Sequence, residues 1–185
     1  MALAFIGSLV VPLDAQNVSI SRNGEALAVR APGLGFIKGE TLARLKDGRT
    51  ARVDLDLTIL PGPGGTPAAR GRQTYVLSYD LWEERFAVTL AGPPPRSVAY
   101  LTANAAEAWC LEQLAIPVGA LGKLRDAPFW IRLEYRVLDG DSAGAGAGDA
   151  DSGVSLKGLI EALSRRPKTT AVTHAVEAGP FRLRS

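Results

Sequence analysis

The chain has one cysteine, Cys110, and one histidine, His174, among its 185 residues. A single cysteine excludes an internal disulfide and a cluster of thiolate ligands within one chain. A Cys–His catalytic pair would need these two residues to meet through tertiary folding, which nothing in the sequence indicates. We therefore interpret Cys110 as a small buried hydrophobe and His174 as a surface residue.

The common catalytic and nucleotide-binding motifs are also missing from the positions where they would act. No G-x-S-x-G, Walker A, H-E-x-x-H or G-x-G-x-x-G motif stands at a turn from a predicted strand into a predicted helix. We predict no catalytic residues and no cofactor, and hence a protein that is not an enzyme. A hydrolase remains a third alternative, weakened by the lack of a histidine partner.

An excess of charge of one sign is absent as well. Lysine and arginine total 21 and aspartate and glutamate total 19, which leaves a net charge of +2. Recognition of nucleic acid would need a dense basic face, so we predict no nucleic-acid partner. Hydrophobic residues make up 46% and charged residues 22%, as in ordinary soluble domains. One domain of this length buries about 70% of the surface that its unfolded chain exposes.

No hydrophobic run is long enough to cross a bilayer. The apolar stretch from Ala2 to Leu13 is too short for a membrane span and about right for the central region of a signal peptide. It lacks a basic start, and Leu13, two positions before Ala15, departs from the A-x-A cleavage rule. We predict that residues 1–16 are a signal-peptide-like remnant of an exported periplasmic or envelope-associated protein. The alternative is a buried first strand.

Alternation of apolar and polar residues dominates the chain from residue 17 onward. The pair Asn23-Gly24 predicts a hairpin with a type I′ turn. A loop at 61–71 separates a strand at 49–60 from a second hairpin at 72–91, and a further strand occupies 128–139. The inward-facing residues of these strands are predicted to be Val53, Leu55, Leu57, Ile59, Tyr75, Leu77, Tyr79, Phe86, Val88, Leu90, Ile131, Leu133, Tyr135 and Val137.

Helices are fewer. Residues 97–115 have helical composition, with Thr102 or Ser97 available as the N-cap and an apolar stripe of Leu101, Ala105, Ala108 and Leu111. A short amphipathic helix follows Ser155, and residues 179–185 read as an edge strand. Residues 41–48 fit either a helical turn or the start of a strand.

Together these elements predict a mainly β fold, β-sandwich-like and antiparallel, with one packed α-helix and a short C-terminal helix. The alternative is an α+β fold. The predicted β-rich core domain covers residues 17–139, a flexible loop rich in glycine and aspartate covers 140–153, and a short helix with a C-terminal tail packed on the core covers 154–185.

Acidic residues gather in two places. The acidic residues around the glycine-rich loop suggest a calcium site, but their spacing departs from that of an EF-hand at its fifth and twelfth positions. We therefore interpret this segment as a solvated loop and predict no metal site. The residues concerned are Asp139, Asp141, Asp149 and Asp151. The second group lies at the tip of the hairpin at 72–91, in the sequence DLWEE, where Asp80, Glu83 and Glu84 read as a solvated turn.

Trp82 stands among these acids, and two interpretations are open. We favour an indole that folds back over Tyr79 and Phe86 to close the end of the core, because aromatic side chains bury large apolar areas. Alternatively, the indole points outward as an anchor for a partner. In that case the partner-binding residues are Asp80, Trp82, Glu83 and Glu84.

The order of the predicted elements resembles a family of small exported bacterial envelope proteins classed as a domain of unknown function. The segments that carry the resemblance are ARLKDGRTARVDLDLTIL, RQTYVLSYDLWEERFAVTL, SVAYLTANAAEAWCLEQL and PFWIRLEYRVLD, within about residues 17–139. The resemblance implies a β-rich envelope protein of unassigned role and supplies no catalytic residues. The glycine-rich insertion and the leader depart from the family pattern.

We therefore expect a non-enzymatic exported binding or scaffold module with a protein partner in the cell envelope. The alternative is a carrier of a small apolar ligand, held in a cavity between sheet and helix. Basic residues near the C-terminus suggest contact with anionic lipid or a partner, although a solvated terminus is the favoured interpretation. These residues are Arg165, Arg166, Lys168, Arg182 and Arg184.

Overall fold

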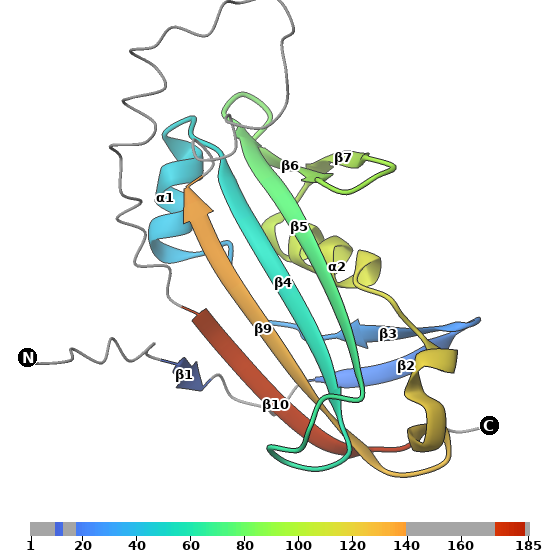
Figure 1. Ribbon diagram of the computed structural model, residues 1–185. Coiled ribbons are helices and arrows are strands. Elements are labelled where there is room, and N and C mark those ends of the chain that lie inside the picture. The colour runs from blue at the N-terminus through green and yellow to red at the C-terminus, as the bar shows by residue number, and fades with distance from the viewer. Residues whose placement is uncertain (1–9, 13–17, 140–172, 184–185) are drawn as a thin grey trace, which may run out of the picture.

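The structure of the protein is a computed structural model that describes residues 10–12, 18–139 and 173–183 (Figure 1). The predicted loop at 140–153 and the helix predicted to follow Ser155 lie outside the described residues. So does most of the predicted leader at 1–16.

Seven strands form a large sheet. In spatial order they are β1 (Val10–Pro12), β10 (Thr173–Phe181), β9 (Phe129–Asp139), β4 (Ala51–Leu60), β5 (Ala69–Asp80), β6 (Arg85–Leu90) and β7 (Arg96–Leu101). Among the described strand pairs, β1 and β10 run parallel and all others are antiparallel. The predicted mainly antiparallel β fold is confirmed.

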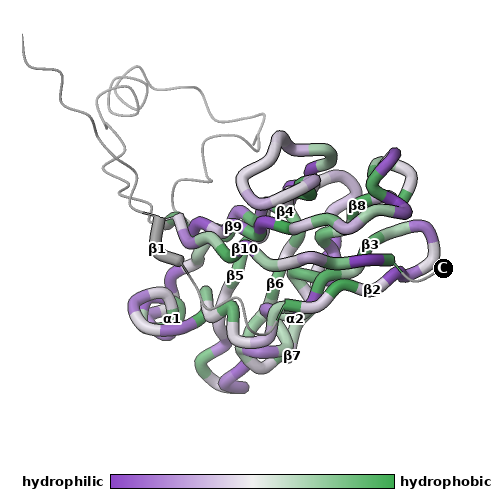
Figure 2. The backbone as a smooth tube through the Cα atoms, turned by 90° about the horizontal axis from the view of Figure 1, so that it is seen from below, coloured by the Kyte–Doolittle hydropathy of each residue, from purple (hydrophilic) through white to green (hydrophobic). Residues whose placement is uncertain are grey.

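A small sheet and three short helices complete the described fold. These elements are β2 (Ser19–Asn23), β3 (Ala26–Arg30), β8 (Ile116–Pro117), α1 (Gly39–Lys46), α2 (Ala103–Gln113) and the 3-10 helix η2 (Val118–Arg125). Helix α2 contacts both β3 and β6. Figure 2, seen from below, shows the small sheet and α2 on one side of the large sheet.

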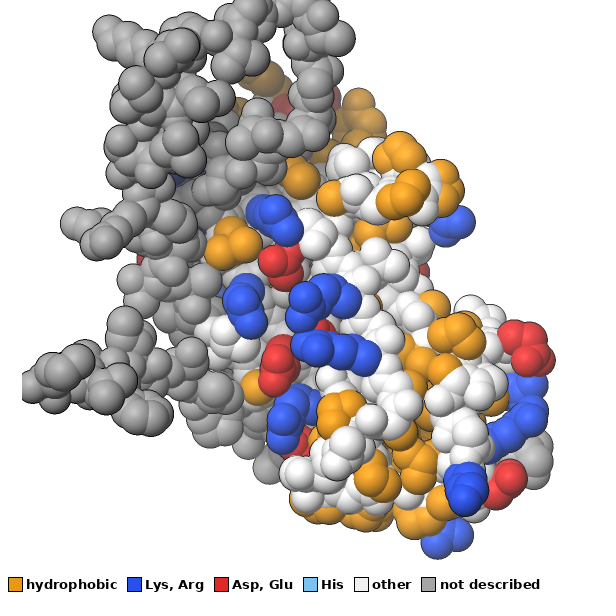
Figure 3. Space-filling view, in the orientation of Figure 1, with side chains coloured by type: hydrophobic (Ala, Val, Ile, Leu, Met, Phe, Trp, Pro, Cys, Tyr) orange, Lys and Arg blue, Asp and Glu red, His pale blue; other side chains and the backbone are white. Residues whose placement is uncertain are grey.

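The core lies between the large sheet and the elements that cover this side of it. On the central strand β4 the alternating apolar residues Val53, Leu55, Leu57 and Ile59 are all 0% exposed, as predicted. Charged side chains of both signs interleave on the opposite face, over β9, β4 and β5 (Figure 3). The sheet therefore has one apolar and one charged face, as expected when one side packs against a core.

Both predicted hairpins form, each with a shifted boundary. Asn23 pairs with Ala26, so the loop between β2 and β3 is Gly24-Glu25, and Gly24 has a φ of 59°. A glycine with positive φ at the first of the two loop positions is typical of a type II′ turn. The predicted type I′ turn at Asn23-Gly24 was therefore wrong in type, and the two-residue loop starts one residue later than predicted. Strand β5 begins at Ala69 because its first residues pair with the end of β4.

The segment at 41–48, predicted as either a helical turn or the start of a strand, lies mostly in helix α1. Helix α2 begins later than predicted. Residues Arg96–Leu101 form strand β7, so Ser97 is no helix cap. Thr102 is the N-cap of α2, and its Oγ1 accepts a hydrogen bond from the backbone N–H of Ala105 at 3.3 Å. This confirms one of the two predicted caps.

The predicted apolar stripe of α2 was largely wrong. The buried residues are Ala106, Glu107, Cys110 and Leu111, whereas Ala108 is exposed. Glu107 is acidic yet lies on the buried face, because its carboxylate accepts hydrogen bonds from backbone N–H groups of a neighbouring loop. An acidic residue on the buried face interrupts the apolar pattern by which the sequence would reveal that face.

The prediction of a surface position for His174 was also wrong. Strand β10 lies between β9 and β1, and His174 pairs with Tyr135 across the β10–β9 ladder. The two rings stack, with centroids 4.7 Å apart and planes at 15°. His174 is half-buried because β10 is an interior strand of the sheet and starts several residues before the predicted edge strand.

Candidate functional site

The predicted partner-binding residues lie in the turn between β5 and β6, at the upper end of the large sheet (Figure 1). We call residues 80–84 the hairpin tip. The carboxylate Oδ1 of Asp80 accepts hydrogen bonds from the backbone N–H of Trp82 at 2.8 Å and of Glu83 at 3.1 Å. Glu84 has a φ of 53°, which turns the chain back into β6. The hairpin tip is thus an exposed turn, as predicted, and its own aspartate braces it.

Trp82 does not close the core. Its exposed fraction is 96%, and that of Leu81 is 58%. The end of the core is already closed by Tyr79 and Phe86, whose ring centroids lie 4.9 Å apart, with Lys46 Nζ 6.0 Å from the Tyr79 ring centroid. An indole that is 96% exposed covers no core residue, so the favoured interpretation of a buried Trp82 was wrong.

Tyr100 adds a third exposed hydrophobic side chain at this end of the sheet. It is 72% exposed, has a φ of 62°, and precedes Leu101, which pairs with Phe86 at the start of β6. The β6–β7 register shifts between Phe86 and Val88, so Tyr100 lies in a bulge. Sequence reasoning placed Tyr100 in a helix, and only the pairing of β6 with β7 reveals its position.

The charged face of the large sheet is satisfied by its own ion pairs. Asp56, only 7% exposed, binds the guanidinium groups of Arg70 and Arg72, and the Arg72–Asp56 contact is 2.7 Å. Burial favours the protonated form of Asp56, yet hydrogen bonds and charges from the two arginines outweigh it and keep its pKa below the ordinary value. Arg132 and Glu177 form a further pair at 2.8 Å. These pairs partly balance the charges of opposite sign on this face.

Cys110 is an inert core residue, as predicted. It is 0% exposed, and its backbone carbonyl accepts a 2.6 Å hydrogen bond from the Tyr75 hydroxyl. Burial, assisted by the charge of Glu107, raises the pKa of the Cys110 thiol to about 12. A thiol that stays protonated at neutral pH is neither a nucleophile nor a metal ligand.

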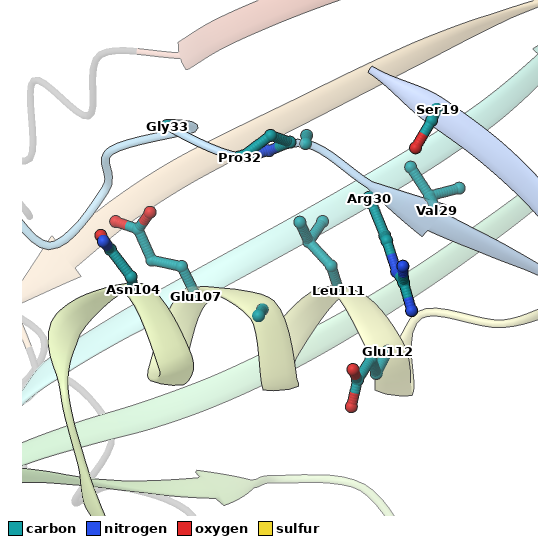
Figure 4. Close-up of a pocket in the computed structure, with 11 residues that line it drawn as sticks. Ser19, Val29, Arg30, Pro32, Gly33, Asn104, Glu107, Leu111 and Glu112 are labelled. Carbon is teal, nitrogen blue, oxygen red and sulfur yellow. The ribbon is translucent and has the colours of Figure 1, made fainter. Parts of the chain in front are cut away.

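A cavity of about 330 Å³ lies between the small sheet, the loop after β3, and α2 (Figure 4). Apolar groups dominate its walls. They come from Val29, Ala31, Pro32, Ala108 and Leu111. Figure 4 shows Asn104 and Glu107 at one end of the cavity, Leu111 in the middle, and Arg30 with Glu112 at the other end.

Glu107 is the buried charged residue of this cavity, with an exposed fraction of 6%. Its two carboxylate oxygens accept one hydrogen bond each, from the backbone N–H of Gly35 at 3.0 Å and of Ile37 at 2.8 Å. These bonds tie the loop after β3 to α2. Burial, followed by the charge of Glu107, also raises the pKa of Tyr135 to about 12.

A second hollow of about 290 Å³ borders α1, β9 and β10, and Lys38, Arg44, Tyr135 and His174 are among its lining residues. His174 Nδ1 is buried and has no hydrogen-bond partner among the described residues. In the described part of the chain, no group of three or more His, Cys, Asp and Glu side chains could hold a metal ion.

In the part of the chain that the structure describes, no helix is long and apolar enough to span a membrane. Of the basic C-terminal residues, Arg182 is described and exposed, whereas Arg165, Arg166, Lys168 and Arg184 lie outside the described residues.

No family model matches the chain, and neither a curated protein nor a solved structure matches it. The resemblance to exported envelope proteins therefore stays a prediction from the sequence.

Proposed function

We propose that the protein is a non-enzymatic binding module that captures a protein partner through the hairpin tip. The observation that carries the proposal is Trp82, which is 96% exposed on a turn braced by two hydrogen bonds to Asp80. Tryptophan is among the residues that most often dominate binding energy at protein interfaces. The two hydrogen bonds order the backbone of the turn before binding, and this lowers the conformational cost of presenting the indole to a partner.

The composition of the hairpin tip indicates the chemistry of the partner. Leu81 and Trp82 offer apolar surface, and Glu83 and Glu84 are exposed acids beside them. A complementary surface is an apolar pocket that accepts the indole, rimmed by lysine or arginine. The proposed location is the cell envelope, and its support is the leader-like composition of residues 1–16 together with the family resemblance. Against it, Val10–Pro12 of this segment form β1 and pair with β10, as the alternative of a first strand expects.

Site-specific photo-crosslinking in cells tests this proposal. A photoreactive phenylalanine derivative at Glu83 should give one discrete crosslinked protein, because this position flanks the proposed anchor. Glu25, at the tip of the β2–β3 hairpin with a side chain 86% exposed, is the matched control position. Identical crosslinking patterns from the two positions would refute a specific role for the hairpin tip.

A second candidate function is a carrier of a small apolar ligand, and the specific observation in its favour is the cavity between the small sheet and α2. Its volume of about 330 Å³ falls within the range of known ligand pockets, and most of its walls are apolar. Native mass spectrometry of gently purified protein tests this function. A retained small molecule supports the carrier, and a bare polypeptide mass from the native host counts against it.

The proposal also includes membrane contact through the basic C-terminal region. Its support is the sequence pattern of Arg165, Arg166 and Lys168. Vesicles that contain anionic lipid should pull down the wild-type chain and release the variant with Arg165→Ser and Arg166→Ser. Equal sedimentation of the wild-type chain and the variant with the vesicles would contradict membrane contact through these arginines.

A further inference from the structure

Glu107 places a buried carboxylate against a mainly apolar cavity. In Figure 4 the Glu107 side chain rises from α2 toward the loop at Gly33, at the end of the cavity away from Arg30. The residue is 6% exposed, so solvent screens its charge only weakly. A ligand that enters this cavity therefore meets both apolar walls and a fixed negative group.

The hydrogen bonds of Glu107 leave part of its accepting capacity unused. Each carboxylate oxygen takes one backbone N–H, whereas a carboxylate has about four acceptor sites in total. The residue forms no ion pair with any described lysine, arginine or histidine. A buried carboxylate without a cationic partner is costly, and a cation at its free positions would lower that cost.

The size of the cavity limits the ligand. A volume of about 330 Å³ lies at the lower end of the range of about 300 to 1,000 Å³ found for small-molecule pockets, which favours a small ligand. The apolar part of the lining suits a hydrocarbon chain, because Val29, Ala31 and Leu111 offer no polar side-chain group.

We infer that the cavity binds a small amphiphilic amine, with its ammonium group on Glu107 and its hydrocarbon chain along Val29, Ala31 and Leu111. This inference rests on the proposed carrier function and specifies its ligand class. An ammonium group supplies both the positive charge and the N–H donors that the carboxylate lacks, and charge-assisted hydrogen bonds are the stronger kind. Asn104 lies at the same end of the cavity and offers a further acceptor (Figure 4).

The competing ligand classes fit less well. A fatty acid with its carboxylate at Glu107 would place two like charges together at low dielectric. In the reverse orientation its carboxylate would lie near Arg30, which is exposed, so that solvent weakens the attraction, and which Glu112 accompanies at that end. A neutral alcohol would match the apolar walls but has a single donor and no charge to compensate Glu107. The three classes therefore differ at one end of the ligand only, which makes them suitable as matched probes.

Calorimetric titration of the full chain with n-octylamine, n-octanol and n-octanoate at neutral pH tests the inference. We expect octylamine to bind about tenfold or more tightly than octanol, and octanoate to be the weakest ligand. In Glu107→Gln, which keeps an acceptor oxygen for the loop, the preference for octylamine over octanol should disappear while octanol still binds.

Ala108→Trp supplies the control for the cavity itself. Ala108 is exposed and lines the cavity, so a large side chain there should block octylamine and octanol together. Ala120→Trp, at an exposed position of η2 outside the lining, should leave both affinities unchanged.

The outcomes separate the ligand class from the carrier function. Equal affinities of wild-type protein for octylamine and octanol would overturn the amine while leaving the carrier in place. Failure of all three probes to bind, or binding that Ala108→Trp does not reduce, would overturn both. If Glu107→Gln does not fold, the ratio of the two wild-type affinities decides alone.

Discussion

Asp80 determines the shape of the hairpin tip, because one carboxylate oxygen accepts the backbone N–H groups of both Trp82 and Glu83. Removing this acceptor leaves two amides to solvent and frees the turn that presents the indole. We predict that Asp80→Ala lowers the free energy of unfolding by about 1 kcal/mol, the typical net contribution of an intramolecular hydrogen bond to stability. Urea denaturation of the variant measures this change.

Glu83→Ala is the matched control for Asp80→Ala, since Glu83 lies in the same turn and is also exposed. Its unfolding midpoint should stay at the wild-type value. An Asp80→Ala midpoint equally unchanged would show that the two hydrogen bonds do not hold the turn in solution.

At the scale of the element, the charged face of the large sheet links stability to pH through Asp56. Burial alone would raise the pKa of this residue, but hydrogen bonds and charges from Arg70 and Arg72 lower it below 3.8. A carboxyl group with a depressed folded pKa stabilises the fold above its unfolded pKa, and this contribution is lost as the pH falls through the folded value.

We therefore predict that Asp56→Asn flattens the loss of stability in acid. The measurement is the urea midpoint from neutral pH down to about pH 2. Below pH 3.8, the ordinary pKa of aspartate, this midpoint should fall less steeply for the variant than for the wild type. Asp126→Asn, at an exposed carboxylate, should keep the wild-type profile. Identical acid limbs for Asp56→Asn and wild type would contradict the role of the arginine pair.

Helix α2 depends on its N-cap, and the two caps that the sequence offered have different roles. Thr102 Oγ1 accepts from the N–H of Ala105, whereas Ser97 lies on β7 and its Oγ is 3.0 Å from Thr89 Oγ1. We predict that Thr102→Ala lowers the free energy of unfolding by about 1 kcal/mol and that Thr102→Ser largely restores it.

Thermal unfolding measures the change, which corresponds to a fall of about 2 to 4 °C in Tm. Ser97→Ala should shift Tm by less, because the hydroxyl contact that it removes lies on the surface. A larger fall for Ser97→Ala than for Thr102→Ala would reverse the assignment of the cap.

For the whole molecule, the sequence predicted what depends on local pattern. The strict alternation of β4 and the turn residues of the two hairpins specify their strands and faces without reference to the rest of the chain. The antiparallel fold class follows from short loops between such strands.

The sequence could not predict features that depend on distant pairing. His174 is half-buried because β10 pairs with β9, the strand of residues Phe129–Asp139. Glu107 is buried because it binds loop N–H groups 70 and 72 positions away. Trp82 is exposed, whereas Tyr79 and Phe86 on the strands beside it pack against each other. Burial preference alone therefore gave the wrong position for the indole.

The central claim is that Trp82 is a binding anchor outside the core. The most direct test is the affinity of Trp82→Ala for the partner identified by crosslinking, compared with wild type at equal folded fraction. We predict an affinity about tenfold or more weaker, with the free energy of unfolding changed by less than about 1 kcal/mol. Undiminished affinity would contradict the claim, and so would a destabilisation of about 3 to 5 kcal/mol, the effect of removing a buried tryptophan.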